Sequence, residues 1–233
     1  MSEITQNIDE INARIARAAE RSGRKKEDIL LLAVTKTIDI PRIKQVVDYG
    51  LTQLGENKVQ EIVDKYDTLG SDVKWHLIGH LQTNKVKYII DKVDLIHSVD
   101  SIKLAQEINK RAEQENKIMN ILIEVNIAEE ESKFGVKPEE TENLIAEISQ
   151  MKNICVKGLM TVAPFVENSE ENRNYFSQMR QLLVDINAKN MNNVNMDVLS
   201  MGMTGDYEVA IEEGATIVRI GTGIFGKRIY PNG

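Results

Sequence analysis

Apolar residues near the N-terminus recur at helical spacing. Ile4, Ile8 and Ile11 lie three or four positions apart with charged residues between them, which is typical of an amphipathic helix. Gly23 is a helix stop, and residues 29–34 that follow it form a continuous apolar run of the kind that is buried in a parallel sheet. The pattern therefore predicts a helix and then a buried strand.

Strand-like and helix-like segments alternate through the rest of the chain. Seven further strands are expected at about 52–55, 74–78, 94–98, 119–126, 156–161, 196–200 and 216–220. Helical patterns separate them, some opened by a proline in the first turn, as at Pro41 and Pro138. Eight strands joined by short helical crossovers predict a closed parallel barrel. We expect an α/β protein, a single (β/α)8 TIM-type barrel with an extra N-terminal helix, as one domain over residues 1–233.

Composition narrows the class of protein. Of the 233 residues, 42% are hydrophobic, and no apolar run reaches the roughly 18 residues that a membrane span needs. The formal charge of −7 argues against broad attraction to nucleic acid or anionic lipid. Cys155 is the only cysteine, so no intramolecular disulfide can form. The N-terminus lacks the pattern of a secretory signal, and we expect a cytoplasmic protein.

Lys36 is the first chemically informative residue. It follows the apolar run 30–34 directly, and in barrels of this kind the chemistry lies at the C-terminal ends of the strands. An ammonium at such a place is poorly solvated, so its pKa tends to fall, and a neutral amine can form a Schiff base with a carbonyl. A lysine that simply leaves the barrel for solvent has the same sequence position.

The C-terminal part of the chain favours the functional interpretation of Lys36. Two glycine-rich stretches, 200–206 and 219–223, follow the last two strands, where phosphate sites of this fold recur. Glycines allow close backbone approach, and Thr222 and Ser200 offer hydroxyl groups. A Schiff-base lysine together with such a phosphate cup fits a phosphorylated aldehyde.

Two other patterns are weaker. Gly221, Gly223 and Gly226 match the dinucleotide fingerprint, but the residues after them leave no room for the helix and acidic residue that it requires. His76 and His80 lie four residues apart, but they bracket a strand-like segment rather than a helix, and no metal is expected. His97 has the position of a satisfied core residue, whereas His80, at a strand end, is the better candidate for contact with a ligand.

Several long blocks of the sequence resemble one known family, the pyridoxal phosphate homeostasis proteins, whose barrel is similar to the N-terminal domain of alanine racemase. The resemblance runs nearly end to end, and its blocks occur in the same order. They are residues 33–36 (AVTK), 54–61 (LGENKVQE), 75–85 (WHLIGHLQTNK), 157–161 (KGLMT), 199–206 (LSMGMTGD) and 218–222 (VRIGT).

The resemblance implies a binding protein for pyridoxal 5′-phosphate (PLP) that maintains the intracellular supply of the cofactor without robust catalysis. Lys36 then carries the Schiff base, Arg219 faces the pyridine nitrogen, and PLP-dependent apo-enzymes are possible recipients. The phosphate contacts that it implies are Ser200, Gly202, Gly221 and Thr222, and the further pocket neighbours are Asn57, His80 and Met203.

Two enzymatic alternatives stay open at this point: a small PLP-dependent amino-acid racemase and a cofactor-free Schiff-base aldolase. An arginine opposite the pyridine nitrogen leaves the ring a weaker electron sink, which disfavours carbanion chemistry without excluding it. In the racemase, a second domain supplies an opposing tyrosine and the dimer interface, and the sequence ends soon after the barrel. We therefore expect no catalytic residues and a monomer.

Overall fold

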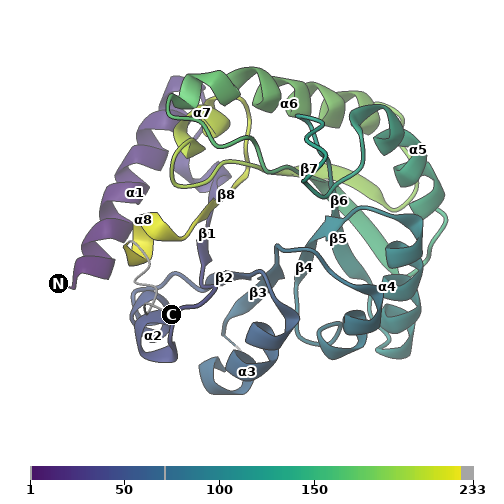
Figure 1. The fold of residues 1–233 in the computed structure, drawn as a ribbon, viewed down its shortest axis with the longest axis horizontal. Coiled ribbons are helices and arrows are strands. Elements are labelled where there is room, and N and C mark those ends of the chain that lie inside the picture. Colours follow the sequence, from purple (N-terminus) through teal and green to yellow (C-terminus); the bar gives the residue numbers. More distant parts are fainter. Residues whose placement is uncertain (1, 71, 227–233) are drawn as a thin grey trace.

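The barrel is closed by eight parallel strands that neighbour one another in chain order, β1 to β8, with β8 paired to β1 (Figure 1). The computed structural model describes residues 2–70 and 72–226. The eight strands and the (β/α)8 fold predicted from the sequence are confirmed. The strands are β1 (Leu30–Val34), β2 (Gln53–Glu56), β3 (Lys74–Leu77), β4 (Leu95–Val99), β5 (Met119–Glu124), β6 (Ile154–Met160), β7 (Val194–Ser200) and β8 (Ile217–Ile220).

Helices surround the ring of strands, and the extra N-terminal helix α1 packs beside α7 and α8 (Figure 1). None of the helices within residues 2–70 and 72–226 is long and apolar enough to cross a lipid bilayer. The α-helices are α1 (Glu3–Arg21), α2 (Ile40–Asp48), α3 (Val59–Leu69), α4 (Ile102–Gln114), α5 (Pro138–Ile148), α6 (Arg173–Asn187), α7 (Tyr207–Glu212) and α8 (Thr222–Phe225), and the 3₁₀ helices are η1 (Lys26–Asp28), η2 (Thr83–Tyr88) and η3 (Ser169–Asn172).

Helix starts follow the local sequence. The Ser2 side chain accepts a hydrogen bond from the N–H of Thr5 at the start of α1, and Asp39 caps α2 in the same way. The segment that begins at Thr83 differs from the expected α-helix, because it forms the 3₁₀ helix η2. Val86 within it and Ile89 and Ile90 just after it are buried, and this spacing of three and four residues suits both kinds of helix.

Two apolar clusters fill the fold on opposite sides of the strands. Leu31 and Ala33 of β1 belong to the large cluster between strands and helices, whereas Leu32 between them belongs to a separate small cluster. Because alternate residues of a strand point to opposite faces, this small cluster lies inside the barrel. Its buried members come from five strands: Leu32, Leu95, Leu122, Met160 and Ile217.

An acidic side chain is also buried at the C-terminal end of β5. Glu124 is 8% exposed, and its Oε2 atom has no hydrogen-bond partner within the described residues. Burial, together with the negative charge of Asp100, raises the pKa of Glu124 to about 7, although the positive charge of Arg219 acts in the opposite direction. This carboxyl group therefore changes charge near neutral pH.

We predict that Glu124→Gln stabilises the protein at pH 8 but not at pH 4. In an unfolded chain, the carboxyl ionises near its ordinary pKa of 4.5, whereas in the folded chain it stays neutral up to about pH 7. The free energy of unfolding of the wild type therefore falls as the pH rises between these values, by roughly 3 kcal/mol in all. Urea denaturation of both proteins at several pH values measures the difference.

The matched control for this prediction is Glu131→Gln, because Glu131 is exposed. Its unfolding free energy should stay within about 0.5 kcal/mol of the wild type at every pH. An unchanged difference between Glu124→Gln and wild type from pH 4 to pH 8 would show that Glu124 has the same pKa in the folded and unfolded chains, and would contradict the prediction.

Candidate functional site

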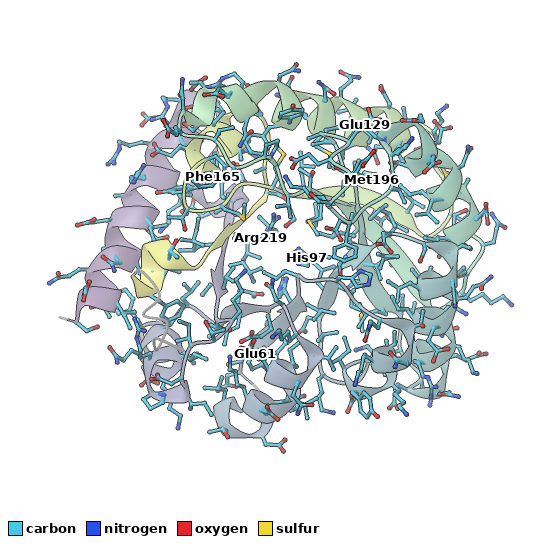
Figure 2. The ribbon with its side chains drawn as sticks, in the orientation of Figure 1. Glu61, His97, Glu129, Phe165, Met196 and Arg219 are labelled. Atoms are coloured by element: carbon cyan, nitrogen blue, oxygen red, sulfur yellow. The ribbon has the colours of Figure 1, made fainter. Side chains whose placement is uncertain are left out.

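A cavity of about 490 Å³ opens at the C-terminal ends of the strands. Six of the residues predicted from the sequence line it: Lys36, Asn57, Met203, Arg219, Gly221 and Thr222. They come from the ends of β1, β2, β7 and β8 or from the residues that follow, so the closure of the barrel brings distant parts of the sequence to one place. Figure 2 shows Arg219 near the centre of the ring of strands, and the 99% exposed Phe165 on a loop beside it.

The turn that carries Lys36 is held on both sides. Lys36 is half-buried and lies two residues after Val34, the last residue of β1. Before it, the Thr35 hydroxyl donates to Glu56 Oε1 at 2.6 Å, and after it, the Thr37 N–H donates to Glu61 Oε2 at 2.7 Å. Thr37 has a left-handed φ of 63°, a conformation that a threonine keeps only when its surroundings enforce it. These bonds fix the direction in which Lys36 leaves the strand.

Lys65 of α3 joins the two carboxylates beneath this turn. Its Nζ atom donates to Glu56 Oε1 at 2.7 Å, to Glu61 Oε2 at 2.9 Å and to the Thr35 carbonyl at 3.0 Å. Burial raises the pKa of Glu56. Burial also acts to raise the pKa of Glu61, but the hydrogen bonds from Thr37 and Lys65 outweigh it and lower the pKa overall. No motif marks Lys65, and the available signal is its place three residues after the buried Ile62.

The glycine-rich stretches meet at the opposite wall of the cavity. The Thr222 hydroxyl donates to Thr204 Oγ1 at 3.1 Å, and the Gly223 N–H donates to the same oxygen at 3.2 Å. Thr204 and Thr222 are exposed and line the cavity. Gly202 is buried instead, with a left-handed φ of 88°, and an added Cβ would lie 2.6 Å from the Cβ of Ala210. Gly202 therefore lets α7 pack closely and does not itself line the cavity.

Two residues that the sequence analysis did not single out hold this wall. Asp206 accepts from the Met203 N–H at 2.7 Å through Oδ1 and from Asn172 Nδ2 at 2.9 Å through Oδ2. Asn172 also donates to the carbonyl of Pro164 at 3.0 Å, and both residues are buried and line the cavity. Asp206 lies inside a quoted block, but Asn172 lies far from it in sequence, so only the fold reveals the pair.

Arg219 lies at the base of the cavity and is 4% exposed. Nη1 donates to the carbonyl and to the hydroxyl of Ser200, both at 2.8 Å, and Nη2 donates to the Thr161 carbonyl at 2.8 Å. Burial lowers the pKa of Arg219 to about 10, so the guanidinium is still charged at neutral pH. The fully buried Ser200 hydroxyl therefore lies beneath the cavity and contacts Arg219. Ser200 does not line the cavity, so the structure does not place this hydroxyl where a phosphate contact was expected.

His80 faces a neighbouring space. Its exposed ring stacks on Phe134, with centroids 4.0 Å apart, and its Nδ1 atom lies 3.9 Å from Asp100 Oδ2. It lines a second cavity, of about 550 Å³, which shares Asn57 with the first. Of the predicted site residues, His80, Ser200 and Gly202 are therefore not brought into the wall of the first cavity, although each lies close to it in the fold.

The donor set of the first cavity suits a particular shape of ligand. Arg219 contributes a positive charge, Lys36 contributes an amine, and Thr204 and Thr222 contribute hydroxyl groups. Such a set fits an anionic group at one wall and a hydrogen-bond acceptor at the base.

Comparisons with known proteins show the family of this chain. The chain matches the family described as alanine racemase, N-terminal domain, over residues 6–229. It is 47% identical over 226 residues to the pyridoxal phosphate homeostasis protein of Aquifex aeolicus, covering 97% of this chain and 98% of the relative. It is 38% identical over 235 residues to the protein of the same name from Escherichia coli K12, with 99% of each chain covered.

Solved structures of similar proteins have the same fold as this chain. PipY of Synechococcus elongatus with PLP bound superposes with a TM-score of 0.80 at 30% identity, over 91% of this chain and all (100%) of that one. Alanine racemase of Clostridium difficile has the same fold, with a TM-score of 0.74 at 16% identity, over 98% of this chain and 57% of the racemase. Given identity of this extent over nearly the whole length, the chain belongs to the pyridoxal phosphate homeostasis protein family.

Proposed function

We propose that this protein holds PLP covalently through Lys36 and takes part in the intracellular homeostasis of the cofactor without robust catalytic turnover. The observation that carries the proposal is the common cavity of about 490 Å³ that Lys36, Arg219 and Thr222 line together. The names of the relatives and the PLP bound to PipY support the choice of ligand.

The residues present fit PLP at both of its ends. Bound PLP supplies an aldehyde carbon that combines reversibly with amines and a pyridine ring that withdraws electrons. Lys36 contributes the amine, and Thr204, Thr222 and Gly221 surround the place for the phosphate. Arg219 is a hydrogen-bond donor for the ring nitrogen, because a guanidinium has no acceptor atom and stays protonated.

The same residues favour holding over turnover. Asp206 is the carboxylate in the described wall of the cavity, and both its oxygens already accept hydrogen bonds. A two-base reaction such as racemisation needs a second positioned base besides Lys36. Arg219 also leaves the pyridine nitrogen unprotonated, which weakens the ring as an electron sink. We therefore assign a carrier role in the cytoplasm, as a monomer, with PLP-dependent apo-enzymes as recipients.

The first prediction of this proposal is that borohydride reduction of the PLP-loaded protein labels Lys36. The matched control is Lys133, which lines the same cavity and donates to Glu130 Oε1 at 2.6 Å. Lys36→Ala should lose the label and the visible absorbance of the loaded protein, whereas Lys133→Ala should keep both. Peptide mass spectrometry reads the site, and label on another lysine with Lys36 unmodified would contradict the assignment.

The second prediction is that the loaded protein exchanges the α-proton of alanine, serine or aspartate in deuterated water far more slowly than roughly 1 per second, an ordinary enzymatic rate. One general base is typically worth about 10² to 10⁴ in rate, and the lining residues within the described part of the chain offer no second base besides Lys36. NMR measures the exchange beside a Lys36→Ala control. Lys36-dependent exchange at an enzymatic rate would favour the racemase alternative, and a colourless protein that cleaves an aldol substrate would favour the aldolase.

A further inference from the structure

A chain of hydrogen bonds crosses the barrel interior from the base of the cavity to the opposite side. The Ser200 hydroxyl, which contacts Arg219, lies 3.0 Å from His97 Nδ1. His97 Nε2 lies 2.9 Å from His76 Nδ1, and His76 Nε2 lies 2.9 Å from Gln53 Oε1. These residues belong to β8, β7, β4, β3 and β2, and Figure 2 shows His97 beside Arg219 near the barrel centre.

Arg219 fixes which atom donates and which accepts in each of these hydrogen bonds. A guanidinium only donates, so Ser200 Oγ accepts from Arg219 Nη1. The hydrogen of the Ser200 hydroxyl then needs an acceptor, and His97 Nδ1 is within reach. His97 must therefore carry its proton on Nε2, which makes it the donor to His76.

Gln53, at the other end of this row of hydrogen bonds, requires the same donors and acceptors. Gln53 Oε1 only accepts, so His76 Nε2 is protonated and donates to it. In a neutral ring, His76 Nδ1 is then the acceptor that His97 Nε2–H requires. Both rings are neutral, because burial lowers the pKa of His76 to about 4 and lowers that of His97 far below its usual value.

The charged groups around the two rings do not reverse this result. Asp94 acts to raise the pKa of His76 but is outweighed by burial. Arg219 and His76 act together with burial to lower the pKa of His97. The chain thus keeps one direction at neutral pH, from Arg219 through Ser200 and both imidazoles to Gln53.

We propose that His97, supported by His76, is a positioning residue of the cofactor pocket that acts through Ser200 to hold the Arg219 guanidinium in one orientation. The two bonds to Ser200 use both N–H groups of Nη1, and the bond to Thr161 uses one N–H of Nη2. The Nε–H and the second N–H of Nη2 are the remaining donors of Arg219 for a ligand. An oriented donor of this kind favours a ligand with a bare ring nitrogen over one with a C–H group at that place. The ligand preference rests on the proposed function, whereas the donor and acceptor assignment of the hydrogen bonds from Arg219 to Gln53 does not.

The orientation is tested on the protein without PLP. Long-range ¹H–¹⁵N correlation spectra of ¹⁵N-histidine protein should show both His76 and His97 protonated on Nε2, and neither should titrate between about pH 6 and 8. An Nδ1-protonated tautomer at either buried ring, or titration of either in this range, would overturn the proposal.

The positioning role is tested by a thermodynamic cycle between His97 and the ring nitrogen. Binding of PLP and of its analogue with carbon in place of that nitrogen is measured by absorbance for wild type, His97→Leu and His97→Asn. His97→Leu removes the acceptor for Ser200 and should weaken PLP about tenfold while changing the analogue less than about twofold. His97→Asn keeps an acceptor oxygen near Ser200 and should recover most of the loss.

Each outcome of the cycle has one meaning. Equal losses for the two ligands would show that His97 only supports the fold, and the positioning role would be wrong. If His97→Leu does not fold, the comparison of the two ligands on His97→Asn and the tautomers of the wild type still decide the question. A wild type that binds no PLP would contradict the proposed function and leave the tautomer result standing.

Discussion

The burial of a guanidinium inside the barrel is the constraint on which the rest of the site depends. Arg219 is 4% exposed, and a buried charge is tolerated only if its donors find acceptors. Those acceptors are Thr161, which directly follows β6, and Ser200 at the end of β7, so they come together only once the barrel is closed. Once Ser200 accepts from Arg219, its own hydroxyl hydrogen needs an acceptor, and the two buried histidines meet that need. Arg219, Ser200 and the two histidines therefore form one connected network.

The wall of the cavity opposite the glycine-rich stretches carries Lys36, and hydrogen bonds there fix the direction of this side chain at the end of β1. Lys36 leaves β1 through a turn that carries a left-handed threonine, and Thr35 and Thr37 are bound to carboxylates that Lys65 joins. A buried ion pair of this kind adds little net stability but restricts geometry. The cofactor-facing groups thus rest on two preorganised supports, one ionic and one built from neutral histidines.

The sequence predicts the strands and the residues at their ends better than it predicts the buried residues that hold those side chains in place. Apolar runs ended by polar residues identify the eight strands, and Lys36 and Arg219 stand out because strand ends carry the chemistry in such barrels. The 3₁₀ character of η2 is not predictable, because its apolar spacing fits both helix types. Lys65, Asn172 and His97 are missed as supports because their partners lie on other strands and helices, so only packing identifies them. Ser200 is expected at the phosphate, but its hydroxyl lies with Arg219, which sequence position alone cannot distinguish.

The most direct test of the account is a crystal structure of this protein grown with PLP. The account predicts continuous electron density from Lys36 Nζ to the cofactor, the phosphate beside Thr204 and Thr222, and Arg219 Nε within about 3.2 Å of the pyridine nitrogen. PLP joined to a different lysine, or a ring turned so that Arg219 contacts another part of the cofactor, would contradict it.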